Sequence, residues 1–108
     1  MNKELLKGST SLLILGLLNK EEMYGYQMIK SIEITSDGIF SFKEGTLYPI
    51  LHTLENEGII ESYWKESETN RKRKYYSITK EGKKYLKTKE KEWSLFSKTV
   101  NKVLGGTS

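Results

Sequence analysis

The fold is decided by residues 45–65, which read Gly45-Thr46-Leu47-Tyr48-Pro49-Ile50-Leu51-His52-Thr53-Leu54-Glu55-Asn56-Glu57-Gly58-Ile59-Ile60-Glu61-Ser62-Tyr63-Trp64-Lys65. The first half carries apolar residues at helical spacing, and it ends at Gly58, a residue favoured just after a helix. Beyond Gly58 the pattern changes to a period of two, which is typical of a strand. The sequence therefore predicts a strand directly after a helix whose buried stripe is Leu47, Ile50, Leu51 and Leu54.

The start of this helix has two possible positions. Ser41 and Glu44 have the spacing of a capping box, which favours a helix that begins near Ser41. Pro49 would kink such a helix, but it is accommodated easily if the helix begins near Thr46. The residues alone leave both starts open.

Two further helices are predicted ahead of this one. Residues 3–19 contain seven Leu residues, Ile14 and no Pro, and their second half is apolar almost all the way round. Such a helix is covered on more than one side. Residues 19–23 are a polar connection to a short helix over residues 24–34, which ends at the turn residues 35–38.

A hairpin and a long helix are predicted to complete the chain. Residues 66–72 are a polar turn in which Asn70 best tolerates a positive φ, and residues 74–79 form a second strand. Thr79 is a suitable N-cap for a last helix of about 25 residues. On that helix an apolar residue recurs every seven positions, at Leu86, Trp93 and Val100, a stripe too narrow for a core but suited to pairing with a partner helix.

Composition narrows the possible functions. The 108 residues have the length of one domain, and the net charge of +4 hides an uneven distribution, with −4 over residues 1–64 and +8 over residues 65–108. The lack of cysteine and the single histidine, His52, exclude disulfides, thiolate sites and a His-based metal cluster. No apolar run approaches the roughly 20 residues of a membrane span, and no cleavage site follows Leu18. We expect a cytoplasmic protein that is not an enzyme and needs no cofactor, metal or membrane.

The order of these elements indicates a fold class. A short helix, a turn, a longer helix and a basic two-stranded hairpin make a winged helix-turn-helix, in a chain that is mainly α (α+β). We expect one compact unit, in which residues 1–79 bind DNA and residues 80–108 form a C-terminal dimerisation helix.

Three segments also resemble the PadR family of transcriptional regulators. The resemblance covers roughly residues 10–104, and it rests on Tyr24-Gly25-Tyr26, on Gly45-Thr46-Leu47-Tyr48-Pro49 with Leu51, Leu54-Glu55 and Gly58, and on Arg73-Lys74-Tyr75-Tyr76 with Ile78-Thr79 and Gly82. It implies a homodimeric winged-helix repressor that responds to small, often aromatic, effectors. The short last helix resembles that of small family members that bind flat multidrug-type ligands. The chain differs at the wing, where Thr69-Asn70-Arg71-Lys72 replaces the Gly or Pro often found there.

Seven residues are predicted to contact DNA. Thr46 and Tyr48 lie at the start of the third helix, just after Lys43; alternatively, Thr46 caps the helix and Tyr48 packs against the wing. The other four are the basic run at the hairpin tip, whose alternative is a solvated turn, namely Arg71, Lys72, Arg73 and Lys74. Lys74 is the weakest candidate because it alternates with Arg73 and can point inward. His52 is expected to be a surface or partly packed residue.

Trp93 has two interpretations. It is either an anchor of the dimer interface or a platform on which a planar ligand stacks between two subunits. In small multidrug-binding relatives a Trp of the last helix acts in the second way, and Trp93 has the matching place in Lys91-Glu92-Trp93-Ser94. The expected surroundings are Leu5, Leu12, Lys89, Phe96, Ser97 and Val100. Trp64 is assigned to packing in the wing or the core.

Together these features predict a sequence-specific DNA-binding regulator. We expect a homodimeric repressor of operator DNA, relieved by a small aromatic or hydrophobic effector at the dimer interface. The two recognition helices would enter successive major grooves about 34 Å apart. The alternatives are an effector-independent winged-helix DNA-binding protein, in which Trp93 is only structural, and a protein-interaction module that uses the same fold.

Overall fold

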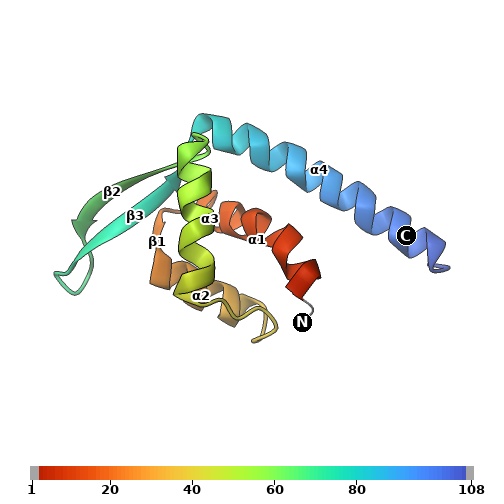
Figure 1. Cartoon of the computed structure of the whole chain (residues 1–108), viewed down its shortest axis with the longest axis horizontal. Coiled ribbons are helices and arrows are strands. Elements are labelled where there is room, and N and C mark those ends of the chain that lie inside the picture. The colour runs from red at the N-terminus through yellow and green to blue at the C-terminus, as the bar shows by residue number, and fades with distance from the viewer. Residues whose placement is uncertain (1–2, 107–108) are drawn as a thin grey trace.

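The computed structural model describes the backbone of residues 3–106 and the side chains of residues 9–106. The elements follow in the order α1 (Lys3–Leu18), β1 (Met23–Tyr24), α2 (Gly25–Thr35), α3 (Glu44–Asn56), β2 (Ile60–Glu66), β3 (Lys72–Ile78) and α4 (Lys80–Val103). Figure 1 shows α1, α2 and α3 gathered beside a narrow sheet, with α4 extending away from them. This confirms the predicted α+β winged helix-turn-helix. No helix in the described part of the chain is long and apolar enough to cross a membrane.

The start of α3 lies between the two predicted positions. The helix begins at Glu44 after Lys43, whose backbone is extended and whose side chain makes no capping hydrogen bond. Neither Ser41 nor Thr46 caps it, so both predicted starts were wrong by two or three residues. Pro49 lies inside the helix. There it costs the hydrogen bond that its missing N–H would have donated within the second turn.

The sheet has a third strand that the sequence analysis missed. It has the order β1-β3-β2, and the two residues of β1 pair antiparallel with β3, Met23 opposite Tyr76 and Tyr24 opposite Tyr75. The ring of Tyr24 meets that of Tyr75 edge-on, with centroids 5.3 Å apart. Residues 19–23 were therefore wrongly predicted to be connection throughout. Two residues are too short for an alternating pattern, and only the tertiary pairing with β3 makes them a strand.

The second strand of the wing begins two residues earlier than predicted. β3 starts at Lys72, opposite Glu66, so that the turn spans residues 67–71 and Asn70 has the expected positive φ of 61°. Of the four basic residues assigned to the tip, only Arg71 lies in the turn, while Lys72, Arg73 and Lys74 are strand residues. Pairing in β3 therefore distributes these three side chains between the two faces of the strand.

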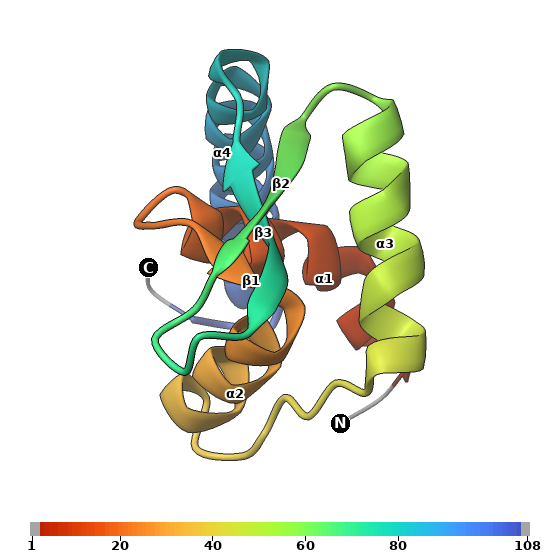
Figure 2. The same cartoon turned by 90° about the vertical axis from the view of Figure 1, so that its left-hand side faces the viewer.

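One core lies between the helices and the base of the sheet. Its fully buried side chains come from α1, α2, α3 and β2, and they are Ile14, Leu15, Met28, Leu47, Leu51 and Ile60. In Figure 2 the strands lie in front, above α2 and to the left of α3, and α1 lies behind them. The predicted stripe of α3 is thus confirmed at Leu47, Leu51 and Leu54, which are buried, and Ile50 is half-buried.

The two long helices α3 and α4 meet at a tight junction. Gly58 ends α3 with a φ of 76°, as predicted for a residue that follows a helix. Thr79 caps α4 by accepting a hydrogen bond from the Gly82 N–H at 3.0 Å, and its own hydroxyl donates to the Gly58 carbonyl at 2.7 Å. The Thr79 N–H donates to the Ile59 carbonyl at 3.1 Å. The beginning of α4 is therefore attached to the end of α3.

Only the first part of α4 packs on the core. Leu86, the first member of the sevenfold repeat, is buried against α1, whereas Trp93, Phe96 and Val103 farther along are exposed. The molecule extends over 53 Å in its longest direction because α4 continues beyond the other helices (Figure 1). The apolar stripe therefore serves the chain's own core at one end and is uncovered at the other.

We predict that Gly82→Ala destabilises the protein by about 3 kcal/mol, since the new Cβ would overlap the Ile59 carbonyl oxygen and lie 2.7 Å from Ile78 Cγ1. Chemical denaturation of the wild type and of Gly82→Ala measures the loss in the free energy of unfolding. Gly45→Ala is the matched control because nothing lies within 4 Å of a Cβ there, and its free energy of unfolding should be unchanged or slightly higher. Equal stability of the two variants would contradict the role of Gly82.

Candidate nucleic-acid interface

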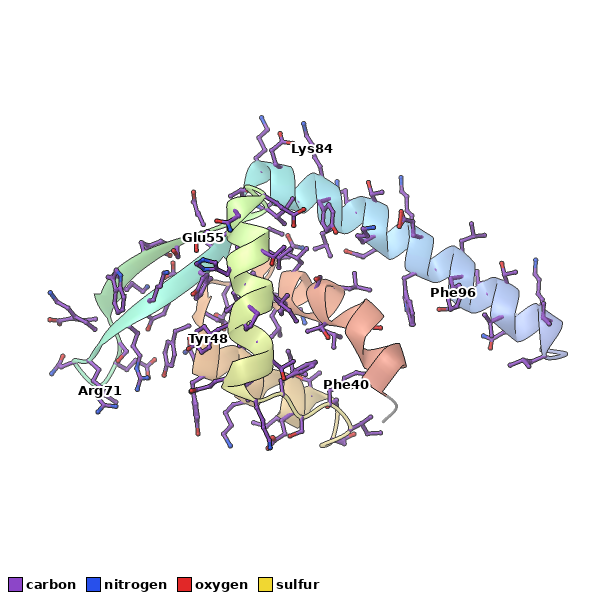
Figure 3. The ribbon with its side chains drawn as sticks, viewed as in Figure 1. Phe40, Tyr48, Glu55, Arg71, Lys84 and Phe96 are labelled. Atoms are coloured by element: carbon purple, nitrogen blue, oxygen red, sulfur yellow. The ribbon has the colours of Figure 1, made fainter. Side chains whose placement is uncertain are left out.

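The side chain of Tyr48 lies between α3 and the start of α2. A Cβ on Gly25 would be 2.5 Å from the Tyr48 hydroxyl oxygen and 2.8 Å from the ring carbon that bears it, so the ring rests directly on this glycine. Glycine at position 25 is therefore what allows Tyr48 to turn toward the sheet. Figure 3 shows Tyr48 on the side of α3 that faces the wing. Two of the segments that carry the resemblance, around Gly25 and around Tyr48, thus meet in space.

The hydroxyl of Tyr48 is held in its neutral form. Partial burial raises the pKa of Tyr48 above its ordinary value, and the nearby Glu44 carboxylate raises it further, while Arg73 lowers it. A neutral phenol can donate a hydrogen bond to a phosphate oxygen, which a phenolate cannot do. Tyr48 is 42% exposed and therefore accessible from solvent.

The other helix residues predicted to contact DNA also face solvent. Lys43 and Thr46 are exposed at the start of α3, and His52 is exposed one turn beyond Tyr48. The alternative assignment of Thr46 as a cap was wrong, because Lys43 has that position. The N-terminal half of α3 thus presents a polar surface beside its buried leucines.

The basic residues of the wing differ in their surroundings. Arg71 projects at the far end of the hairpin (Figure 3) and Lys72 is exposed beside it. The Arg73 guanidinium lies 4.7 Å from the centre of the Tyr24 ring. Lys74 points back to α3 and its Nζ lies 4.0 Å from a carboxylate oxygen of Glu55, in agreement with the expectation that it points inward. Arg71 and Lys72 are therefore the two cations most available to an external phosphate.

A cavity of about 400 Å³ separates α3 from the wing. Its lining combines aromatic rings and cations, and it consists of Tyr24, Tyr26, Glu44, Tyr48, His52, Trp64, Lys72, Arg73, Lys74 and Tyr76. Four of the seven residues predicted to contact DNA are among them. Tyr26 and Trp64 were not predicted for this surface. Trp64 was assigned to packing in the wing or the core, and the core alternative was wrong, since its side chain is 67% exposed. Trp64 alternates with Ile60 and Ser62, and the Ser62 hydroxyl bonds to Glu55 of α3, so this face of the strand turns to α3.

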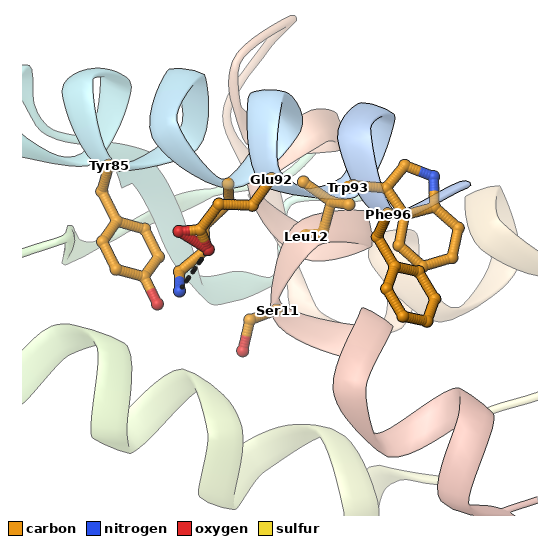
Figure 4. Close-up of a pocket in the computed structure, with 7 residues that line it drawn as sticks. Ser11, Leu12, Tyr85, Glu92, Trp93 and Phe96 are labelled. Carbon is orange, nitrogen blue, oxygen red and sulfur yellow. Dashed lines mark hydrogen bonds and ion pairs between the residues drawn. The ribbon is translucent and has the colours of Figure 1, made fainter. Parts of the chain in front are cut away.

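A second cavity of about 310 Å³ lies between α1 and α4 (Figure 4). It brings together four of the residues predicted around a ligand, Leu12, Lys89, Trp93 and Phe96. Ser97 and Val100 do not line it: the Ser97 hydroxyl donates to the Trp93 carbonyl at 2.9 Å, on its own helix. Leu5 lies outside the described side chains.

Three residues of this second cavity were not predicted. They are Ser11, Tyr85 and Glu92. Helical spacing could have indicated two of them, since Tyr85 lies two turns before Trp93 and Glu92 lies one turn before Phe96. The ring of Trp93 is tilted by 30° against that of Phe96, with centroids 6.1 Å apart. Lys89 interrupts the apolar repeat here, and its Nζ donates to Glu92 Oε1 at 3.3 Å, a hydrogen bond that raises the pKa of Lys89.

Neither cavity offers the ligands of a metal centre. Within residues 9–106 no group of three or more His, Asp or Glu side chains is placed to hold a metal ion. Both cavities instead combine aromatic surface with Lys side chains, a combination suited to anionic or planar partners.

These features define a class of protein. A helix with an exposed polar face, preceded by a shorter helix and followed by a basic hairpin, is the arrangement of a winged helix-turn-helix DNA-binding protein.

Comparison with known proteins agrees with this class. Residues 14–88 match the transcriptional regulator PadR-like family. Among solved structures, a transcriptional regulator from Clostridium thermocellum is 41% identical, with a TM-score of 0.85 over 94% of this chain and 96% of the other. A PadR-like transcriptional regulator from Bacillus cereus is 34% identical, with a TM-score of 0.86 over 97% of this chain and all of the other. A protein X of Lysinibacillus sphaericus, which has no assigned function, is 32% identical over 98% of this chain and 97% of its own length.

The chain belongs to the PadR-like family of transcriptional regulators. It is accordingly a DNA-binding regulator, and the prediction that it is not an enzyme is confirmed by this membership.

We predict that Glu44→Gln lowers the pKa of Tyr48 toward its ordinary value of 10.0, because the carboxylate that disfavours the phenolate is removed. Removal of the opposing cation in Arg73→Gln should raise this pKa. The measurement is an NMR titration of ¹³Cζ-labelled tyrosine. Glu57→Gln, at the other end of α3, is the control and should leave the titration of Tyr48 unchanged.

Proposed function

We propose that the protein is a homodimeric repressor of operator DNA, relieved by a small aromatic or hydrophobic effector bound at the dimer interface. The observation that supports DNA recognition most directly is the position of the wing. Lys72, Arg73 and Lys74 of the wing line one cavity together with Tyr48 of α3. Lys43 and Thr46 are exposed at the start of the same helix. In this proposal Thr46 and Tyr48 contact the major groove, while Arg71, Lys72 and Arg73 contact phosphates. Lys74, already paired with Glu55, contributes least.

The support for a dimer comes from α4. Its distal half exposes large apolar side chains that one chain leaves uncovered, namely Trp93, Leu95, Phe96, Val100, Val103 and Leu104. A second copy related by a two-fold axis would bury them and would set two copies of α3 on the same side of the assembly. In this division residues 1–79 bind DNA and residues 80–108 hold the dimer together.

The support for an effector comes from the cavity between α1 and α4. In a single chain this cavity is open to solvent, and Trp93, itself 50% exposed, forms one wall with Phe96 (Figure 4). A second α4 would close this space and bring a second Trp93 near the first. A planar ligand stacked there would relieve repression only if it binds the DNA-competent and the incompetent dimer with different affinities.

We predict that Lys72→Ala weakens binding to the DNA upstream of the gene and flattens its salt dependence. Each lost phosphate contact should lower the slope of log K against log [salt] by about 0.9, and a dimer loses two. Fluorescence anisotropy of a labelled duplex over a range of NaCl concentrations measures the slope. Lys102→Ala removes the same charge at the far end of α4 and should leave the slope as in the wild type. Absence of any salt-dependent binding at low salt would favour a protein-interaction module.

We predict that a planar aromatic dye such as proflavine quenches the emission of Trp93. In a Trp64→Phe background Trp93 is the sole indole, so the quenching reports this site alone. Trp93→Ala should weaken dye binding, followed by the anisotropy of the dye, by about tenfold, because the stacking surface is removed. Trp93→Phe keeps a ring and should lie between the two. Equal affinity of the wild type and Trp93→Ala would make Trp93 an interface anchor of an effector-independent regulator.

A further inference from the structure

Trp64 is a large apolar side chain that is exposed on the wing, and folding of the wing does not explain this exposure. It lies on β2, opposite Lys74 in the antiparallel register, and 67% of it is accessible. The residues two and four positions earlier on the same face of β2 are engaged with the body of the protein. Ile60 is buried in the core, and the Ser62 hydroxyl donates to the Glu55 carboxylate on α3. Beyond Ser62 this face of the strand leaves α3, and Trp64 borders the open cavity.

The opposite wall of that cavity belongs to α3. Tyr48 and His52 line it from the exposed face of the helix, and Tyr76 of β3 closes its base. The cavity of about 400 Å³ is thus bounded by α3 on one side and by β2 and β3 on the other, and Tyr24 and Tyr26, at the junction of β1 and α2, complete its lining. This cavity forms a passage between α3 and the wing, which are the two elements that contact DNA in a winged-helix protein.

The charge of this passage is positive. Lys72, Arg73 and Lys74 line it against the single carboxylate of Glu44. Glu55, which lies deeper, is already engaged by the Ser62 hydroxyl and by Lys74. The excess of cations complements a chain of phosphates, and the indole of Trp64 supplies an apolar surface next to them.

The geometry of a DNA duplex indicates which part of it would occupy this passage. When a recognition helix enters the major groove and the wing reaches the adjacent minor groove, the DNA strand that separates the two grooves passes between helix and wing. We propose that the cavity between α3 and the wing holds the sugar–phosphate backbone of this strand, with Trp64 packed against a deoxyribose and Lys72 and Arg73 against the flanking phosphates. This inference rests on the proposed function, since it needs α3 and the wing to be applied to DNA together.

The proposed contact of Trp64 with a deoxyribose should affect affinity, sequence preference and salt dependence in different ways. Sugar and phosphate are the same for every base pair, so Trp64 would add affinity without adding sequence preference. An apolar contact releases no counterions, so it would not alter the salt dependence. These two properties distinguish Trp64 from Thr46, which is proposed to contact the major groove, and from Lys72, which is proposed to neutralise phosphates.

The test uses Trp64 as its own reporter. In a Trp93→Phe background Trp64 is the sole indole, and addition of the upstream duplex should shift or quench its emission. Trp64→Ala should weaken binding by about tenfold, equally for the upstream duplex and for an unrelated duplex, with the salt slope unchanged. Trp64→Phe, which retains an apolar ring, should recover most of the affinity. Because Trp64 is exposed, thermal melting of Trp64→Ala should match the wild type, which excludes misfolding as the cause.

The outcomes separate this inference from the proposed function. Wild-type binding with unchanged Trp64 emission, together with wild-type affinity of Trp64→Ala, overturns the inference and leaves DNA binding in place. A loss confined to the upstream duplex also overturns it, since Trp64 would then contribute to sequence recognition. Failure of the wild type to bind either duplex at low salt overturns the proposed function and this inference with it.

Discussion

The structure depends on the close approach of α4 to the end of α3. The Ile59 carbonyl, just after α3, lies where any side chain at position 82 would stand, and it accepts the Thr79 N–H. The first turn of α4 is therefore held against the segment that joins α3 to β2. Since β3 leads directly into Thr79, the same junction sets where the wing leaves the body. The Ile59 carbonyl and the absence of a side chain at position 82 thus set how α3, the wing and α4 lie relative to one another.

In the proposed repressor, this junction would connect the two cavities mechanically. Trp93 lies fourteen residues beyond Thr79, about 21 Å along a continuous helix. A change in the direction of α4 at Trp93 would be transmitted through the helix to Ile59, and from there to α3 and the wing. Proteins respond in this way only when two packed arrangements compete, because close-packed elements do not deform continuously. In the proposed repressor those arrangements are two geometries of the dimer.

Much of the fold could be predicted from local patterns. The helix predicted over residues 24–34 was confirmed at Gly25–Thr35, one residue later. The strand after Gly58, the positive φ of Asn70 and the N-cap at Thr79 were confirmed as well. Each of these features depends on interactions within a few residues. The start of α3 was not predictable, because two local signals, the capping spacing at Ser41 and the position of Pro49, conflict. β1 was missed since its two residues become a strand only by pairing with β3. The basic run was placed at the tip because a charge pattern does not reveal where a turn begins.

The sequence by itself determined the class of this protein: the order of its elements, the basic second half and three segments of family type point to one winged-helix regulator. Only the tertiary structure decided which side chains share a surface. It placed Tyr48 on Gly25, moved Trp64 from the expected packing role to the wall of a charged passage, and divided the repeat of α4 into a buried Leu86 and an exposed Trp93. The physical reason is that periodicity assigns residues to the face of an element, whereas burial depends on what another element places against that face.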